Sequence, residues 1–441
     1  MIVQLPYGKE NLELSIPDRH FLQTLLPNEV QTDLVGTEEV IRALEHPIGT
    51  ERLKDLVSPG QKVAIVTSDI TRPLPSYLVL PPVLKELNRG GISDSDITIV
   101  FALGSHRAHT REEMIHLVGE EVFNRVKCVD SKDDFVHMGT TRRGTPVDIY
   151  RDVAEADVRI CLGNIEFHYF AGYSGGSKAI MPGVSTRNAI QCNHSRMVQA
   201  EAKAGAIEGN PIREDIDEVC ERFVPITFIV NVILDEKKRI RRCVAGHFIK
   251  AHREGCRFLD QLYKIQIPHR ADIVIVSAGG YPKDINLYQA QKALDNAKHA
   301  VKDGGCILWA ASSKEGLGAE VFEKWMTGHE KAHDMIEHIS REFQLGGHKA
   351  AAIAMVLEKA DIYLYSDMDA DFVRSIHLKP CQDLQAELDS ALSRYGENAS
   401  VIVMPYGGST LPCTKYAVIV KSRLISMKSW QNDKNATKIE K

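Results

Sequence analysis

Short, almost uninterrupted hydrophobic runs recur in the first half of the chain and alternate with helical patterns. Three of them, KVAIVTSD, ITIVFALG and VRICLGN, cover residues 62–69, 97–104 and 158–164. Between the first two lies LVLPPVLKELNRGG (78–91), whose apolar spacing predicts a helix that ends at the two glycines. Buried strands separated by helices are typical of a parallel sheet covered on both faces.

The same alternation starts again at DIVIVSAGG (272–280). A helix is expected over 286–305, and further strands are expected over 306–312, 361–367 and 400–409. The sequence therefore predicts an α/β fold of two domains, each with a mainly parallel sheet flanked by helices. We expect a first domain at 1–268 and a second at 269–414. For the tail of about 415–441, a frayed end and packing back onto the first domain both stay open.

Length and charge narrow the class of protein. A chain of 441 residues exceeds the usual size of one domain, which fits the two predicted domains. The net charge of −5 and the lack of a long basic stripe argue against nucleic acid as a partner. The one basic run, KKRIRR (237–242), is interpreted as a solvated hairpin or loop.

Membrane and export signals are missing from the pattern. No apolar stretch approaches the ~20 residues that cross a bilayer, and the first residues do not resemble a signal peptide. Nine cysteines are scattered without a CxxC pair, which predicts reduced thiols. We therefore expect a cytoplasmic protein that binds neither a membrane nor nucleic acid. Nothing in the pattern indicates an oligomeric state.

Polar side chains follow each of the first three predicted strands. They are Ser68–Asp69, Ser105–His106 and the segment 164–168. Functional groups of parallel α/β sheets gather at the carboxyl ends of the strands. We therefore expect these side chains to share one edge of the first sheet.

The stretch 164–197 combines groups that suit a bound cofactor. It holds His168, a glycine-rich turn at 172–176, Lys178 and His194. Glycines let backbone N–H groups approach an anion such as phosphate, and a desolvated lysine amine can form a covalent bond. Histidine can transfer protons or bind a metal. Together these residues predict a tethered, phosphate-bearing cofactor that contains a metal.

Each of these side chains also has a simpler interpretation. Lys178 could be exposed or contact a phosphate, and His194 could be an interior histidine bonded to backbone. A P-loop is excluded by spacing, because GYSGGSKA lacks the GxxxxGK[ST] pattern. Asp69 and Arg72 could form an ion pair that only orients a loop, and a histidine at a strand end is often a surface residue.

A second group of polar residues lies on the helix expected after 280. Tyr288, Gln289 and Lys292 fall on one helical face, which presents a phenol, an amide and an ammonium group. This face could be a solvated surface or a ligand contact.

Four segments of the chain resemble the nickel-dependent lactate racemase (LarA) family. They are HYFAGYSGGSK…PG…NH within 168–194, SDITRPLPSYLVLPPVL (68–84), LGSHRAHT (103–110) and GGYPKDINLYQAQKAL (279–294). The resemblance spans roughly half of the chain in the family's order. It implies an active site in a cleft between the two domains, with a nickel-pincer nucleotide as cofactor, a pyridinium mononucleotide that binds Ni(II) through carbon and two sulfurs.

The resemblance also implies roles for individual residues. His106 and His168 would be the acid/base pair, with His109 as the alternative to His106. His194 would be the protein ligand of nickel, a metal that imidazole suits. Lys178 would hold the cofactor covalently, and further cofactor contacts would come from Asp69, Gly172, Ser174, Gly175 and Gly176. Substrate contacts would come from Arg72, Tyr288, Gln289 and Lys292.

The activity implied by the resemblance is racemisation or epimerisation of a 2-hydroxy acid at C2. Hydride would leave C2 for the cofactor and return to the other face, while two histidines exchange the hydroxyl proton. Cofactor-assembly proteins would be transient partners. Some lactate-specific members carry a pocket tryptophan, which the candidate segment 346–354 lacks, so the substrate could be lactate or another 2-hydroxy acid.

Two other functions are weighed against this interpretation. The first is a non-catalytic, two-domain protein that binds a nucleotide or solute, which retention of His106, His168, Lys178 and His194 argues against. The second is an NAD-dependent dehydrogenase, which requires a GxGxxG motif that GYSGGS does not supply.

Overall fold

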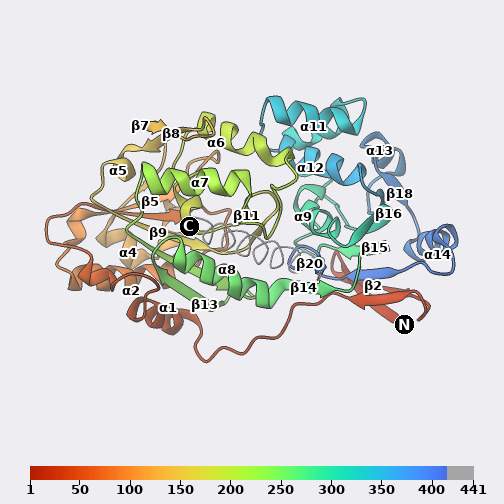
Figure 1. The fold of residues 1–441 in the computed structure, drawn as a ribbon, viewed down its shortest axis with the longest axis horizontal. Coiled ribbons are helices and arrows are strands. Elements are labelled where there is room, and N and C mark those ends of the chain that lie inside the picture. The colour runs from red at the N-terminus through yellow and green to blue at the C-terminus, as the bar shows by residue number, and fades with distance from the viewer. Residues whose placement is uncertain (415–441) are drawn as a thin grey trace, which may run out of the picture. The chain divides into compact units, whose positions relative to one another are not determined.

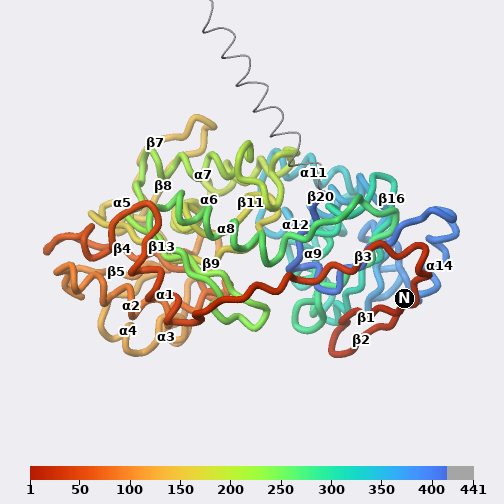
Figure 2. The backbone as a smooth tube through the Cα atoms, turned by 60° about the horizontal axis from the view of Figure 1, so that its bottom comes forward, coloured from red at the N-terminus to blue at the C-terminus, as the bar shows by residue number. Residues whose placement is uncertain are grey.

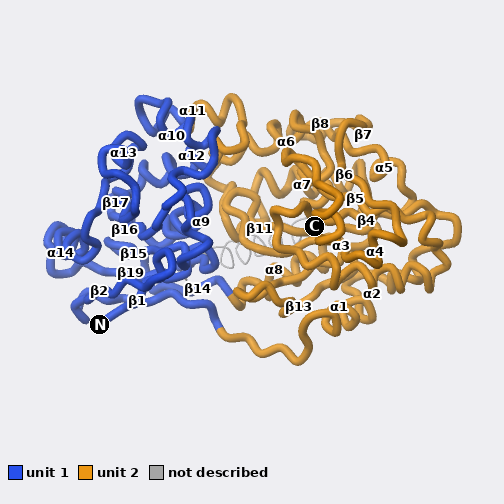
Figure 3. Tube along the Cα trace, turned by 180° about the vertical axis from the view of Figure 1, so that it is seen from behind, with its two compact units in different colours: residues 1–28, 263–335, 349–441 blue, residues 29–262, 336–348 orange. Residues whose placement is uncertain are grey.

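The computed structural model describes residues 1–414, and the expectation for the tail at 415–441 lies outside the described residues. The chain forms two compact units, each assembled from separate segments of sequence (Figure 3). Unit 2 comprises Glu29–Leu262 and Ile336–His348, and unit 1 comprises Met1–Asn28, Tyr263–Met335 and the segment from Lys349 onward. The predicted two-domain α/β fold is confirmed. The boundary at 268/269 and the cleft between the domains stay predictions.

The sheet of unit 2 has six strands in the order β13-β12-β9-β4-β5-β6. Strands β5, β9 and β13 of this sheet are labelled in Figure 1. All neighbours are parallel except β12 and β13, which are antiparallel. The predicted strands at 62–69, 97–104 and 158–164 are confirmed to within two residues. The strands are β4 (Val63–Ser68), β5 (Ile97–Ala102), β6 (Lys127–Asp130), β9 (Val158–Asn164), β12 (Phe228–Leu234) and β13 (Ile240–Gly246).

Helices cover this sheet because their apolar faces pack onto the hydrophobic strands. The predicted helix at 78–91 is α2 (Ser76–Arg89), and its buried Leu80 and Leu84 share one core cluster with Ile65 of β4 and Ile99 of β5. The other helices are α1 (Gly36–Glu45), α3 (Arg111–Val118), α4 (Glu120–Arg125), α5 (Arg151–Ala154), α6 (Arg187–His194), α7 (Pro211–Arg222) and α8 (Lys250–Tyr263).

Short elements complete unit 2. The basic segment 237–242 lies at the turn between β12 and β13, where Lys238 has φ +62° and Arg239 pairs with Asp235 at 2.8 Å. This is the hairpin that the sequence predicts. Two small antiparallel ladders are formed by β7 (Phe135–Thr140) with β8 (Pro146–Tyr150) and by β10 (Phe167–His168) with β11 (Gly172–Tyr173).

The sheet of unit 1 has six parallel strands in the order β18-β17-β16-β15-β19-β3. Its edge strand β3 comes from the first 28 residues, as does the β1–β2 hairpin, which lies beside α14 (Figure 2). The strands are β1 (Ile2–Tyr7), β2 (Glu10–Ser15), β3 (Phe21–Thr24), β15 (Ala271–Ser277), β16 (Val301–Ala310), β17 (Asp361–Tyr365), β18 (Lys379–Cys381) and β19 (Val401–Met404), with a separate parallel pair of β14 (Lys264–Ile267) and β20 (Leu411–Thr414).

The helix predicted at 286–305 is too long. The helix α9 covers Leu287–Ala297, and the last five residues of the prediction open strand β16. Gly305 lies within β16 and does not end a helix. A Cβ at this position would lie 2.6 Å from the carbonyl oxygen of Asp272 on β15, so glycine is needed there for the two strands to pair. The remaining helices are α10 (Glu320–Gly328), α11 (Ala332–Arg341), α12 (Gly347–Leu357), α13 (Ala370–Ser375) and α14 (Leu384–Tyr395).

Candidate active site

Asp69 and His106 meet at the carboxyl edge of the unit 2 sheet. They follow the adjacent parallel strands β4 and β5, and the Asp69 Oδ2 lies 2.6 Å from the His106 Nδ1. An ionised carboxylate only accepts hydrogen bonds, so Nδ1 carries the proton and the lone pair is on Nε2. Among residues 1–414, no hydrogen bond occupies His106 Nε2, and 28% of the side chain is exposed. The ring is therefore held by one nitrogen and available at the other.

The surroundings of Asp69 keep it ionised. Burial alone would raise the pKa of this carboxyl, but the hydrogen bond and charge of His106, with the charge of Arg72 and the hydroxyl of Thr71, outweigh burial and lower it. The Thr71 hydroxyl donates at 3.0 Å. An ionised Asp69 can stabilise a protonated imidazole at His106.

His109 has a different environment from His106. Its side chain is buried, its Nδ1 bonds the Asp130 carboxylate at 2.6 Å, and its Nε2 accepts the Ile70 backbone N–H at 3.0 Å. Both ring nitrogens are therefore occupied by the protein. His109 ties the loop after β4 to the loop after β5, and this separates its role from that of His106.

The glycine-rich turn is shaped by its protein neighbours. Gly172 has φ +78°, and a Cβ there would lie 1.9 Å from the carbonyl oxygen of Ala206. Gly175 has φ +75° and would meet the Asn231 side chain, whose Oδ1 also accepts the Gly176 N–H at 2.8 Å. These glycines are thus required by packing and by backbone conformation, whatever ligand they contact.

The hydroxyl of Ser174 serves the same turn. It donates to the Asn164 carbonyl at 2.6 Å and accepts the Glu166 N–H at 2.8 Å. The Ser174 carbonyl in turn is bonded by His252 Nε2 at 2.8 Å. The turn after β9 is therefore held firmly, and it fixes the short helical turn at 176–179 that carries Lys178.

Lys178 has an amine without a charge partner. Loss of hydration, and then the positive charges of Arg213 and Arg72, lower its pKa well below the ordinary value. Its Nζ lies 5.9 Å from the centre of the Phe170 ring, and no described residue gives it a hydrogen bond or ion pair. A lowered pKa raises the fraction of neutral, nucleophilic amine, so this lysine can form a covalent bond.

His168 is the second histidine at this edge. Its Nδ1 accepts the Ala171 N–H at 3.3 Å, and its ring stacks on Tyr169 with centroids 5.3 Å apart. Burial, followed by the charges of Lys178 and His194, lowers its pKa well below the ordinary value. His168 is therefore neutral in the folded protein.

His194 ends α6 with one nitrogen fixed and one open. The Asn193 Oδ1 accepts its Nδ1–H at 2.8 Å, while the rings of Phe170 and Phe343 pack on it edge-on. Burial lowers the pKa of His194 well below the ordinary value, with Lys178, His348 and Arg72 acting in the same direction. Nε2 has no hydrogen-bond partner within residues 1–414, so a neutral imidazole presents a lone pair there.

Unit 2 thus brings together most of the predicted site residues. His168, Lys178, His194 and Arg72 lie close enough for their charges to interact, whereas the substrate residues Tyr288, Gln289 and Lys292 belong to unit 1. Within the described chain, no three His, Cys, Asp or Glu side chains are grouped so that they could hold a metal ion.

The unit 1 residues lie on the first turns of α9. Asn286 caps this helix, its Oδ1 accepting the Gln289 N–H at 3.0 Å. Gln289 is exposed, and Tyr288 and Lys292 are half-buried. Lys349 of α12 packs on Tyr288, with Nζ 3.9 Å from the ring centre and bonded to the Tyr288 carbonyl.

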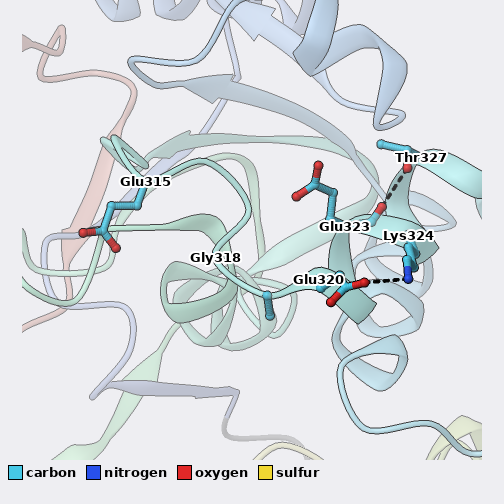
Figure 4. Close-up of a pocket in the computed structure, with 7 residues that line it drawn as sticks. Glu315, Gly318, Glu320, Glu323, Lys324 and Thr327 are labelled. Carbon is cyan, nitrogen blue, oxygen red and sulfur yellow. Dashed lines mark hydrogen bonds and ion pairs between the residues drawn. The ribbon is translucent and has the colours of Figure 1, made fainter.

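Unit 1 also has a surface depression of about 490 Å³ (Figure 4). Three carboxylates, Glu315, Glu320 and Glu323, face it, and Lys324 is paired with Glu320 at 2.6 Å. An excess of negative charge disfavours an anionic ligand such as a hydroxy acid. None of the predicted site residues lines this depression.

Sequence reasoning missed several residues that support the site. Arg213 is fully buried and bonds the carbonyls of Ala171 and Tyr173 in the glycine-rich turn. Asn193 and Asp215 hold His194, and Lys349 lies on Tyr288. Arg213 and Asp215 could have been found in the segment PIREDIDEVC (211–220). Its helical pattern places charged residues on the face that also carries the apolar, buried positions.

The fold and these side chains define an α/β enzyme with paired histidines, a lysine of lowered pKa and the positive charges of Arg72 and Arg213 near one sheet edge. Comparison with known proteins specifies the family. Residues 7–205 match the lactate racemase N-terminal domain, and residues 267–411 match the lactate racemase C-terminal domain. The chain therefore belongs to the lactate racemase family and is an isomerase.

Similar proteins span almost the whole chain. A lactate racemase from Thermoanaerobacterium thermosaccharolyticum is 34% identical over 93% of this chain and 98% of its own length. A lactate racemase from Lactiplantibacillus plantarum is 32% identical over 92% of this chain and 98% of its own length. The structure of the lactate racemase apoprotein from the first organism matches with a TM-score of 0.84 and 33% identity, over 94% of this chain and 100% of that one.

A more distant structure, of a protein from Thermotoga maritima, shares the fold. It has a TM-score of 0.63 at 18% identity, over 88% of this chain and 100% of that one. Among the described residues, no helix is both long enough and apolar enough to cross a membrane.

Proposed function

We propose that this protein racemises a 2-hydroxy acid at C2, with lactate, the substrate named for its relatives, as the first candidate. The observation that carries the proposal is the grouping of Lys178, His168 and His194, whose pKa values are all lowered by burial, beside the Asp69–His106 pair in unit 2. These groups supply a covalent anchor, a metal ligand and two proton carriers.

The residues present fit a nickel-pincer nucleotide. Lys178 has a free amine for the covalent link, and His194 Nε2 has a free lone pair for nickel. Ser177 Oγ is buried without a hydrogen bond, which leaves a donor for an anionic group, and Arg213 Nη1 has only an ion pair with Asp217 at 3.7 Å. When bound, the cofactor supplies the acceptor for hydride from C2. Gly172, Ser174, Gly175 and Gly176 remain predicted cofactor contacts.

His106 and His168 divide the proton transfer between them. His106 Nε2 accepts the proton of the substrate hydroxyl, and ionised Asp69 stabilises the imidazolium that forms. His168 carries out the matching transfer for the opposite enantiomer. A reaction that runs in both directions requires one such group for each face of C2.

Positive side chains hold the substrate carboxylate. Arg72 lies within electrostatic reach of Asp69, His168, Lys178 and His194, which places its charge at the sheet edge. In unit 1, Gln289 and Lys292 complete the carboxylate contacts, and Tyr288 lines the site. The guanidinium fork of arginine suits a carboxylate because it can donate two parallel hydrogen bonds.

The cofactor indicates which proteins would be partners, and the cysteines indicate the cellular location. Proteins that assemble the cofactor are proposed as transient partners. All nine cysteines, which lie within the described residues, are free thiols, in keeping with a cytoplasmic location.

The proposal is tested by intact mass and nickel content. The protein is produced in cells that carry the cofactor-assembly machinery, beside Lys178→Ala and the control Lys85→Ala, an exposed lysine of α2. We expect a cofactor-sized adduct and about one nickel per chain, lost only in Lys178→Ala. Unmodified, nickel-free wild-type protein, beside a loaded relative from the same cells, would contradict the proposal.

A further inference from the structure

Asp215 lies at the centre of a buried hydrogen-bond network one step removed from His194. Its side chain is fully buried on α7. The hydroxyls of Thr141 and Thr145 donate to it at 2.5 and 2.6 Å, and the Asn193 amide donates at 2.8 Å. Arg196 completes the set, with Nη1 3.4 Å from Oδ2. A buried carboxylate with this many donors is satisfied and fixed in orientation.

This carboxylate decides how the Asn193 amide is turned. The Asn193 Nδ2 faces two acceptors, Asp215 Oδ2 at 2.8 Å and the Ile212 carbonyl at 3.3 Å. The Ile212 carbonyl can only accept, and Asp215 Oδ2 already accepts the Thr145 hydroxyl, so the NH₂ group must point at them and Oδ1 must point away. The Asn193 Oδ1 lies 2.8 Å from the His194 Nδ1 and can only accept.

The orientation of Asn193 then sets the tautomer of His194. An acceptor at Nδ1 requires the proton to be on Nδ1, which leaves the lone pair on Nε2, the nitrogen without a partner in the described chain. A neutral imidazole with the opposite tautomer would present an N–H at that position and could not bind a metal. The rings of Phe170 and Phe343 pack on His194 but carry no hydrogen-bonding group.

We infer that Asp215 is a positioning residue for the nickel ligand, acting through Asn193 to hold His194 as the Nδ1–H tautomer with Nε2 directed to the metal. The inference rests on the proposed function for the identity of the metal. The hydrogen-bond relay itself concerns only residues of this chain. Asp215 itself is fully buried and is joined to His194 only through Asn193.

The relay is tested in the apoprotein by nuclear magnetic resonance of ¹⁵N-labelled histidine, with His194 assigned by its loss in His194→Gln. We expect the wild-type signal to be that of a neutral ring protonated at Nδ1. In Asp215→Asn the new amide can present an NH₂ group to Asn193, which then turns, and the Nε2–H tautomer appears. Asn193→Ala, which removes the acceptor but keeps Thr141, Thr145 and Arg196 on Asp215, should also lose the exclusive Nδ1–H signal.

Thr145→Val is the matched control. It removes one donor from the same carboxylate, leaves the Asn193–His194 contact in place and should keep the wild-type tautomer. A second measurement follows nickel release from cofactor-loaded protein in excess EDTA. Release should be about 10- to 100-fold faster in Asp215→Asn, the usual effect of losing an outer-shell partner. In Thr145→Val the release rate should stay near that of the wild type.

The outcomes separate the relay from the proposed function. A wild-type His194 protonated at Nε2, or an unchanged tautomer in both Asp215→Asn and Asn193→Ala, overturns the relay. An equal tautomer shift in Thr145→Val also overturns it, because the effect would then be a general disturbance of the core. A correct tautomer pattern in a protein that takes up no nickel supports the relay and contradicts the proposed cofactor.

Discussion

His106 and His109, three residues apart on one loop, each bond a carboxylate through Nδ1 at 2.6 Å, yet only His106 leaves Nε2 open. The second ring nitrogen of His109 accepts the backbone N–H of Ile70. The same residue type therefore offers an open nitrogen, that of the proposed proton carrier, at one position and a structural tie at the other. The difference comes from which backbone group each ring meets, and it cannot be seen in the letters GSHRAHT.

The two histidines should respond differently to glutamine. His106→Gln should lower racemase kcat by about 10²- to 10⁴-fold, the usual value of a general base, with little change in unfolding free energy. His109→Gln should cost about 1–3 kcal/mol of stability, because the buried Asp130 carboxylate loses the imidazole hydrogen bond and keeps only the His109 backbone N–H from this residue. Kinetics and urea unfolding of both variants check this. Equal losses of activity at unchanged stability would assign His109 to the chemistry as well.

Asp69 should make the free energy of unfolding depend on pH in the acidic range. Its pKa is lowered in the folded protein, so its ionised form stabilises the fold above its ordinary pKa of 3.8, and this contribution is lost as pH falls through the lowered value. Asp69→Asn should cost about 1.5–3 kcal/mol near pH 6. The difference from wild type should shrink below about pH 4. Unfolding free energies measured across this range test the sign, and a difference that grows on acidification would contradict it.

Replacing Lys178 should stabilise the apoprotein. Its pKa is lowered by folding, so the unfolded chain binds more protons at neutral pH and protonation favours unfolding. Lys178→Met should therefore unfold at higher urea concentration than wild type at pH 7. The gain should fade toward pH 10, where the unfolded lysine also loses its proton. Lys85→Met is the control and should show no such pH-dependent gain.

Gly172 should tolerate no side chain. In Gly172→Ala the new Cβ would lie 1.9 Å from the Ala206 carbonyl oxygen at φ +78°, so we expect a loss of about 3 kcal/mol or more. Gly144→Ala is the matched control, because φ is +84° and nothing lies within 4 Å. Its cost should be about 1 kcal/mol. Urea unfolding of the two variants separates the effect of the steric clash from that of backbone strain. Equal losses of stability would mean that the clash with Ala206 contributes nothing.

Lys292 should affect substrate binding more than folding. Lys292→Ala removes a proposed charge-assisted contact to the carboxylate, so KM should rise by about 10- to 100-fold. The control Lys324→Ala lies on α10, where the lysine pairs with Glu320 in the acidic depression. Steady-state kinetics and melting temperatures of both variants check the assignment. An unchanged KM for Lys292→Ala would remove this residue from the substrate contacts.

The sheet strands were predictable because their information is local. A run such as VAIVTS is apolar at nearly every position, and only a strand buried on both faces accommodates it. The helix at 286–305 was overextended because Gly304–Gly305 looks like a helix stop in sequence. Glycine is instead required at 305 because the backbone comes close to Asp272 of a neighbouring strand, and this contact joins separate segments of the chain.

The support of the site was not predictable for a related reason. Asp215 receives hydrogen bonds from Thr141 and Thr145, which precede it by more than 60 residues. Nothing in the local pattern around Asn193 shows that its amide will face Asp215. The proposed proton carriers His106 and His168 follow strands and can be predicted from their position, whereas the side chains that orient the candidate site depend on the finished packing.

The pairing of β3 with β19 has a consequence for synthesis. Residues 21–24 pair with residues 401–403, so this edge of the unit 1 sheet cannot close until nearly the whole chain has left the ribosome. The six strands of unit 2 are complete once residue 246 has emerged. The short turn at 176–179 and helix α6, which carry Lys178 and His194, have then also emerged, while the β19 partner of the N-terminal segment is still being made. A nascent chain stalled before residue 401 would display all strands of the unit 2 sheet while β3 of unit 1 is unpaired.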